Sequence, residues 1–212
     1  MIFKINARVN LLIKIVVFLK FIVLLVYAIA VIRNIPALRY NYYLATADEV
    51  LYVLILLYII SVLRFLGEKE FVRAFFFTYL VVELVISAFG VIVSHIPHPL
   101  LFSLMIAFGL AVLIVLASLS VFIASLSIQS TLIFKPILLY TTTLAVFTIL
   151  EFPVIGILVL FEGNDAKGIK IAAVENGIHN FNLVLIGMML IVVIWLANRV
   201  NRYVRDIQTF DA

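Results

Sequence analysis

Two glutamates lie inside long apolar segments of this chain, at Glu83 and Glu151. Residues 75–86 around the first and residues 148–156 around the second are mainly aliphatic or aromatic. A carboxyl group is costly to hold in the apolar interior of a membrane, and where one occurs it commonly handles a proton, an ion or a substrate. We therefore treat Glu83 and Glu151 as a candidate intramembrane proton or ion site.

The neighbours of Glu151 favour a site of this kind. Pro153 has no N–H group to donate, so it would leave the carbonyl of Ile149 free and open the helix beside the carboxyl group. Thr141 and Thr148 precede Glu151 by ten and three residues, which places all three on one helical face. Many transport sites combine polar side chains with an interrupted helix in this way. The alternative is a protonated Glu151 that donates a structural hydrogen bond to a Ser or Thr of another helix.

Glu83 has a candidate partner in Lys20. Counted from Phe71 at 1.5 Å per residue, Glu83 lies about 18 Å from the inner end of its helix. Lys20 lies about 14 Å from the inner end of the first span, counted from Leu11. The similar depths predict an ion pair between Lys20 and Glu83. If Lys20 instead extends to the interface, Glu83 loses this partner and is protonated or exposed to water.

The three histidines, His95, His98 and His179, are weak candidates for a metal site on the outer side. Pro97 separates the first two, so they do not form a helical pair, and two histidines alone do not hold zinc. We favour ordinary histidines at the membrane interface and predict no metal and no cofactor.

Signatures of soluble-type catalysis are absent from the sequence. It contains no G-x-S-x-G, H-E-x-x-H or Walker A motif. The chain has no cysteine, which excludes thiolate metal sites, disulfides and a thiol nucleophile. A non-enzymatic role is favoured, and a lipid-modifying membrane enzyme without a recognisable motif is a third alternative.

The composition indicates which elements must position these residues. Of the 212 residues, 67% are hydrophobic and 12% are charged, whereas soluble domains contain about 25% charged residues. A membrane-spanning helix needs about 20 apolar residues. We predict a single all-α integral membrane domain over residues 1–212, a bundle of six transmembrane helices. The expected spans are 11–32, 47–66, 71–94, 100–127, 136–161 and 178–198.

The distribution of charge predicts the orientation. With both termini cytoplasmic, eleven of the fifteen Lys and Arg residues fall on the inner side. The outer side then carries the remaining four, Arg33, Arg39, Lys167 and Lys170. Cytoplasmic loops carry an excess of Lys and Arg, so the N-in, C-in topology is favoured. The same basic residues account for the net charge of +4 as contacts with lipid headgroups, and we predict no nucleic-acid partner.

Serines in the fourth expected span favour close packing of that helix. Ser118 and Ser125 are seven residues apart, as are Ser120 and Ser127. Small polar residues at helical spacing let membrane helices approach one another and exchange hydrogen bonds. Packing is therefore the favoured role, and a contribution to a solute path is the alternative.

The function predicted from these features is transport, with intramembrane carboxyl groups that handle a proton or a small solute. The alternative is a non-catalytic structural or assembly subunit of a larger membrane complex. The expected partners are the lipid bilayer and other membrane subunits or further copies of this chain. The sequence has no N-x-[ST] glycosylation site, which fits a protein of the prokaryotic plasma membrane.

Overall fold

The protein is helical throughout the residues that the structure describes. The computed structural model describes residues 3–33, 35, 41–95, 100–151 and 168–210. They form the helices α1 (Ala7–Ile32), α3 (Tyr42–Phe65), α4 (Glu70–His95), α5 (Leu100–Ser125), α6 (Thr131–Ile149) and α8 (Gly168–Phe210). No strand occurs in these ranges, which confirms the all-helical prediction.

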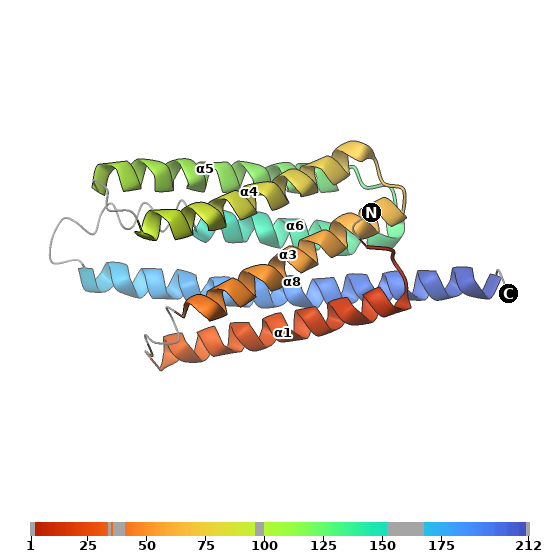
Figure 1. Ribbon diagram of the computed structural model, residues 1–212, viewed down its shortest axis with the longest axis horizontal. Helices are drawn as coiled ribbons and strands as arrows, with labels where there is room; N and C mark the ends of the chain where they lie inside the picture. Colours follow the sequence, from red (N-terminus) through yellow and green to blue (C-terminus); the bar gives the residue numbers. More distant parts are fainter. Residues whose placement is uncertain (1–2, 34, 36–40, 96–99, 152–167, 211–212) are drawn as a thin grey trace.

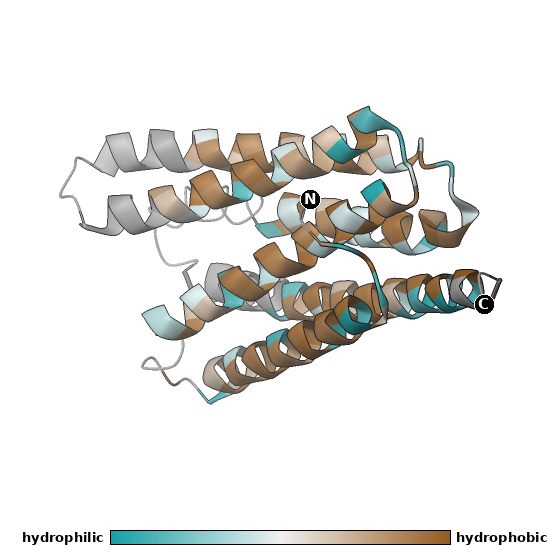
Figure 2. Ribbon diagram, turned by 45° about the vertical axis from the view of Figure 1, so that its right-hand side comes forward, coloured by the Kyte–Doolittle hydropathy of each residue, from teal (hydrophilic) through white to brown (hydrophobic). Residues whose placement is uncertain are grey.

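All six helices are long and apolar enough to cross a membrane. Their outward faces are covered by large apolar side chains, among them Phe18, Ile123 and Ile191. Figure 2 shows hydrophobic residues along the middle of the helices and hydrophilic residues near the ends and connections on the side of the C-terminus. This distribution suits a protein whose outer surface faces lipid, and it supports an integral membrane protein.

Several helices extend beyond the expected spans. The side-chain oxygen of Asn6 accepts a hydrogen bond from the Val9 N–H (2.9 Å), so α1 starts before residue 11. Asn41 caps α3 in the same way, accepting from the Leu44 N–H at 3.0 Å. Helix α8 has 43 residues, or about 65 Å, so it is longer than the apolar core of a bilayer. Helices continue into polar flanks because caps, rather than hydropathy, fix their ends.

The helices form a ring in sequence order. Each one packs against its neighbours along the chain, and α8 packs against both α6 and α1, which closes the ring. Both termini lie at the same end of the bundle (Figure 1). We call this the terminal end and the other the opposite end.

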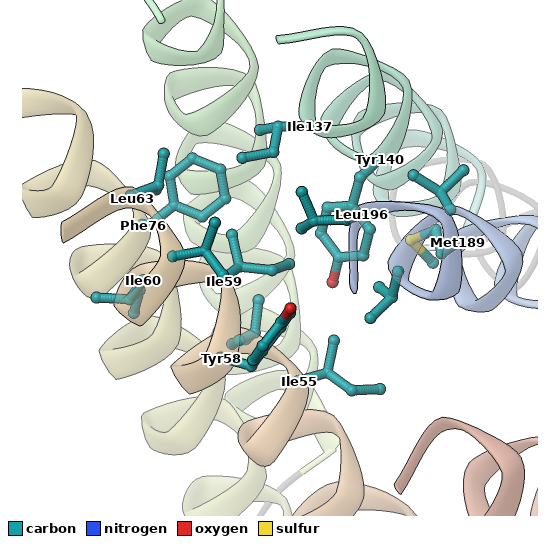
Figure 3. Close-up of a cluster of buried hydrophobic side chains, with 14 of the residues drawn as sticks. Ile55, Tyr58, Ile59, Ile60, Leu63, Phe76, Ile137, Tyr140, Met189 and Leu196 are labelled. Atoms are coloured by element: carbon teal, nitrogen blue, oxygen red, sulfur yellow. The ribbon is translucent and has the colours of Figure 1, made fainter. Parts of the chain in front are cut away.

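Apolar side chains fill the middle of the ring. The buried residues repeat at spacings of three and four, so they share one face of each helix. Figure 3 shows side chains from four helices converging there: Ile55, Ile59 and Leu63 of α3, Phe76 of α4, Ile137 and Tyr140 of α6, and Met189 and Leu196 of α8. The interior is a packed core.

Two pairs of hydroxyl groups join α5 to α6. Ser118 Oγ lies 2.6 Å from Thr148 Oγ1, and Ser125 Oγ lies 2.9 Å from Thr141 Oγ1. Both pairs are buried. The two antiparallel helices carry these residues at the same seven-residue spacing, so the hydroxyl groups meet in register. The packing role predicted for the α5 serines is confirmed at Ser118 and Ser125.

The turn between α3 and α4 fixes the start of α6. Gly67 has a φ of 69°, a backbone conformation that favours glycine, and it ends α3 in a Schellman motif. The next residue, Glu68, is buried, and its carboxylate accepts hydrogen bonds from the N–H groups of Gln129 (3.0 Å) and Ser130 (2.8 Å). A carboxylate at this position offsets the unpaired N–H groups and the dipole at the start of α6.

Pro136 lies inside α6 rather than at its start, and α8 compensates for it. Proline donates no hydrogen bond, so the Leu132 carbonyl, four residues earlier, lacks its helical partner. Arg199 Nη1 of α8 donates to this carbonyl at 2.9 Å. The guanidinium group also lies over the Trp195 ring, 5.2 Å from its centroid. The carbonyl that Pro136 leaves unpaired in α6 thus forms a hydrogen bond that joins α6 to α8.

We expect Arg199→Met to lower the free energy of unfolding by about 1–3 kcal/mol, because the Leu132 carbonyl then has no donor. In a Pro136→Ala background the new N–H group supplies a donor, and the same substitution should cost about 1 kcal/mol less. Denaturant unfolding in detergent micelles of the four proteins of this double-mutant cycle measures the difference. If Arg199→Met lowers the free energy of unfolding equally with proline and with alanine at position 136, Arg199 does not compensate for the proline.

Candidate functional site

A partly buried ion pair joins α1 to α3. Lys20 is 5% exposed, and its Nζ lies 2.6 Å from Asp48 Oδ1. The ammonium group also donates to the Asp48 carbonyl at 3.1 Å and lies 5.2 Å from the centroid of the Tyr52 ring. The predicted ion pair between Lys20 and Glu83 is corrected here: the similar depth was right, but the rotation of α1 directs Lys20 toward α3.

Two further carboxyl groups belong to this cluster. Glu83 of α4 lies within electrostatic range of Glu49, Tyr79 and Lys20. Glu49 lies within range of Lys20 and Asp48, and its Oε1 is buried with no hydrogen-bond partner among the described residues. Glu83 is therefore part of a polar group, with Lys20 as a neighbour rather than as its direct partner.

Three tyrosines extend the cluster toward the centre of the ring. The hydroxyl groups of Tyr52 and Tyr79 lie 3.0 Å apart. The Tyr140 hydroxyl is buried and has no hydrogen-bond partner within the described part of the chain. A void of about 10 Å³, the size of about one water molecule, is lined by Lys20, Tyr52 and Tyr140 together with apolar residues. We call Lys20, Asp48, Glu49, Tyr52, Tyr79, Glu83 and Tyr140 the polar cluster.

Helical spacing groups these residues around the middle of the bundle. Asp48 and Tyr52 are four residues apart on α3, and Tyr79 and Glu83 are four apart on α4, so each pair forms a stripe on one face. Lys20, Tyr52 and Glu83 each lie about 20 Å from the terminal end of their helix. Tyr79 and Tyr140 lie about 14 Å from that end and Asp48 about 26 Å, so the polar cluster spans the middle of the bundle, with its acidic groups on the side of the opposite end.

The charges of the polar cluster do not balance. Three carboxyl groups share one ammonium group, so full ionisation would leave a net charge of −2. Apolar surroundings oppose uncompensated charge strongly. Binding a proton or another cation reduces this excess, and the tyrosine hydroxyl groups can both donate and accept a hydrogen bond beside it.

Glu151 lies away from the polar cluster, beyond the last residue of α6. Leu150 and Glu151 form a wider, π-type turn there, about 30 Å along α6 from Thr131 and so far from mid-span. Asn182 of α8 donates a hydrogen bond to Glu151 Oε2, while the Asn182 Oδ1 is buried without a partner among described atoms. Residues 152–161 of the expected span lie outside the described residues.

Thr141 and Thr148, predicted to line a site with Glu151, direct their hydroxyl groups to the serines of α5. The structure therefore assigns them a bond between helices and does not bring them to the polar cluster. His98 lies outside the described residues. For His95 and His179 only the backbone is described, in α4 and α8.

Sequence reasoning missed most of the polar cluster. Asp48 and Glu49 lie within two turns of the start of α3 and resemble ordinary interfacial acids. The available signal was the pairing of polar stripes, Asp48 with Tyr52 and Tyr79 with Glu83, on two consecutive helices. Consecutive antiparallel helices usually pack together, so stripes at equal depth are candidates for contact.

We compared the chain with protein-family models, with curated proteins and with solved structures, and nothing matched in any of the three.

We expect Lys20→Met to lower the free energy of unfolding by about 2–4 kcal/mol, because it leaves the carboxyl groups without their cation. Asp48→Asn should cost less, since the Asp48 side chain is 36% exposed. The double variant should cost about 1–3 kcal/mol less than the sum of the single variants. Unfolding in micelles measures these values, and Lys14→Met, on the same helix but outside the cluster, is the control. If the losses of unfolding free energy in the two single variants simply add up in the double variant, the ion pair between Lys20 and Asp48 does not stabilise the protein.

Proposed function

We propose that this chain is a multi-pass protein of the prokaryotic plasma membrane that transfers protons through the polar cluster, in the service of transport. The observation that carries the proposal is the convergence of Lys20, Asp48, Glu49 and Glu83 from three helices inside an apolar bundle. Ionisable groups at this depth are costly and are retained mainly where they serve a pathway.

The arrangement favours a proton over a larger solute. The void beside the polar cluster holds about one water molecule, which is too small for an organic substrate. A proton needs only a series of groups that exchange hydrogen bonds, and Tyr52 and Tyr79 already do so across α3 and α4. Lys20 disfavours a metal cation, because its ammonium group already occupies Asp48 and repels a second positive charge.

Asp48 provides the access expected of such a site. Its side chain is 36% exposed, whereas that of Lys20 is 7% exposed, so the pair reaches from the surface into the interior. Glu49 lies within electrostatic range of Asp48 and also of Glu83. We infer that protons enter from the opposite end of the bundle at Asp48 and pass to Glu83.

A second function is favoured by a different observation, the packed middle of the ring. Large apolar side chains fill the space between the helices, as a structural or assembly subunit of a membrane complex requires (Figure 3). In that case the polar cluster fixes the rotation of α1, α3 and α4, and its protons do not exchange during function.

We propose that both termini are cytoplasmic. Lys20 is buried within the bundle and is therefore left out of the charge count. Of the other fourteen Lys and Arg residues, ten still fall on the cytoplasmic side in this orientation. The common location of the termini at one end of the bundle agrees with an even number of spans (Figure 1).

Proton flux distinguishes the two functions. In liposomes that enclose a pH-sensitive dye, with a potential set by potassium and valinomycin, the wild-type protein should acidify or alkalinise the interior according to the sign of the potential. Glu83→Gln should reduce the rate at least tenfold, because it removes the central proton-binding group while keeping the shape of the side chain. The initial rate of the dye signal is the measurement.

Asp206→Asn, on α8 and outside both the polar cluster and the pocket at the terminal end, is the matched control and should leave the rate unchanged. Glu151→Gln tests whether the second carboxyl group contributes. A wild-type rate equal to that of empty liposomes, or an unchanged rate in Glu83→Gln, would reject proton transfer through this site. The first of these outcomes would favour the assembly subunit.

The orientation can be tested directly because the chain has no cysteine. In intact cells, a membrane-impermeant thiol reagent should label Tyr43→Cys, at the start of α3, where the side chain is 84% exposed. Lys69→Cys, in the exposed turn before α4, should react only after the cells are opened. The reverse pattern would invert the topology.

A further inference from the structure

An open pocket of about 250 Å³ lies at the terminal end of the bundle. The N-terminal segment, the last turn of α3 and the first two turns of α4 form its walls. Its lining includes Phe3, Ile60, Arg64, Glu70, Arg73 and Phe77. The pocket is separate from the polar cluster, which lies deeper in the bundle.

The pocket carries an excess of positive charge. Arg64 and Arg73 contribute two guanidinium groups and Glu70 contributes one carboxylate. Neither arginine forms an ion pair with an acid among the described residues. The Arg73 Nε is buried and has no hydrogen-bond partner in the same part of the chain. The guanidinium groups therefore have donors to offer to an anion.

The rest of the pocket lining includes apolar side chains, which lie further from the ends of the helices than the arginines do. Phe77 lies one turn beyond Arg73 on α4, about 6 Å further along the helix toward the middle of the membrane. It is 52% exposed, so it joins the pocket to the outer apolar surface of the bundle. Ile60 of α3 lines the same side.

We propose that this pocket binds the phosphate group of an anionic phospholipid, with an acyl chain of the lipid along Phe77. Arginine binds phosphate through two parallel hydrogen bonds, which makes it well suited to this group. The charged part lies at the end of the helices, where headgroups are found, and the apolar part lies where acyl chains begin. Free phosphate would use the arginines but gain nothing from Phe77.

The test is the lipid retained by the purified protein in native mass spectrometry. Phosphatidylglycerol and phosphatidylcholine with identical acyl chains are supplied in equal amounts, and the ratio of the two bound species is measured. The wild-type protein should retain phosphatidylglycerol preferentially. The double variant Arg64→Gln/Arg73→Gln should reduce that preference about tenfold, since each basic residue near anionic lipid contributes to its binding.

Two variants separate the pocket from general electrostatics. Arg202→Gln/Arg205→Gln removes the same charge from exposed positions on α8, outside the pocket, and should keep the preference. Glu70→Gln removes the negative charge at the pocket and should increase it. A variant that only disturbed the fold would not bind phosphatidylglycerol more selectively, so an increase in Glu70→Gln indicates that these residues bind the lipid.

Three results would overturn the proposal. The pocket variant could keep the wild-type preference, the α8 variant could lose as much of it, or millimolar inorganic phosphate could displace the lipid fully, which would indicate a site for free phosphate. If circular dichroism shows that the double variant is unfolded, Arg64→Gln alone replaces it, because Arg64 is exposed. We expect about a threefold reduction for that variant, and an unchanged preference would again reject the site.

Discussion

The constraint on which this structure depends is the absence of competing water around the middle of the helices. A polar group there must find its partner inside the protein, because an unsatisfied one costs several kcal/mol. The hydroxyl pair of Ser118 and Thr148 and the bond from Arg199 to the Leu132 carbonyl satisfy this requirement between different helices. Each such bond also fixes the rotation of the two helices that it joins. Apolar packing alone would not do so, since the lipid chains are as apolar as the helix surfaces.

The exceptions to this rule are few, and most of them lie at places with a functional hypothesis. Six buried side-chain atoms lack partners within the described residues. Glu49 Oε1 and the Tyr140 hydroxyl belong to the polar cluster, Asn182 Oδ1 lies beside Glu151, and Arg73 Nε belongs to a residue that lines the pocket at the terminal end. The other two, Asn10 Nδ2 and Asn201 Oδ1, lie outside these places. A buried polar atom without a partner is rare in native proteins and calls for an explanation such as a bound ion, a proton path or a ligand. The polar cluster, the contact between Glu151 and Asn182, and the pocket at the terminal end therefore each contain a buried polar atom without a hydrogen-bond partner.

The polar cluster and the packed core place opposite demands on the ring. A solute path would need open space along the axis, whereas Ile59, Phe76 and Leu196 occupy it. A proton places no such demand, since hydroxyl and carboxyl groups can pass it on without a wide opening. Proton transfer is therefore the form of transport that this packing tolerates best. At the terminal end, the carboxylate of Glu68 and the guanidinium of Arg199 both hold α6, so the helices are tied together on the side away from the cluster.

The sequence by itself determined the all-helical fold, the six apolar segments and the packing role of Ser118 and Ser125, because hydropathy and helical spacing are local properties. It also placed Lys20 and Glu83 at similar depth. Only the tertiary structure decided that Lys20 pairs with Asp48, that Glu68 caps a helix sixty residues later and that Arg199 compensates for Pro136. The physical reason is rotational: each residue turns a helix by about 100°, so depth follows from counting along the chain. The side chain that faces a given neighbour depends on how all six helices are rotated when the ring closes.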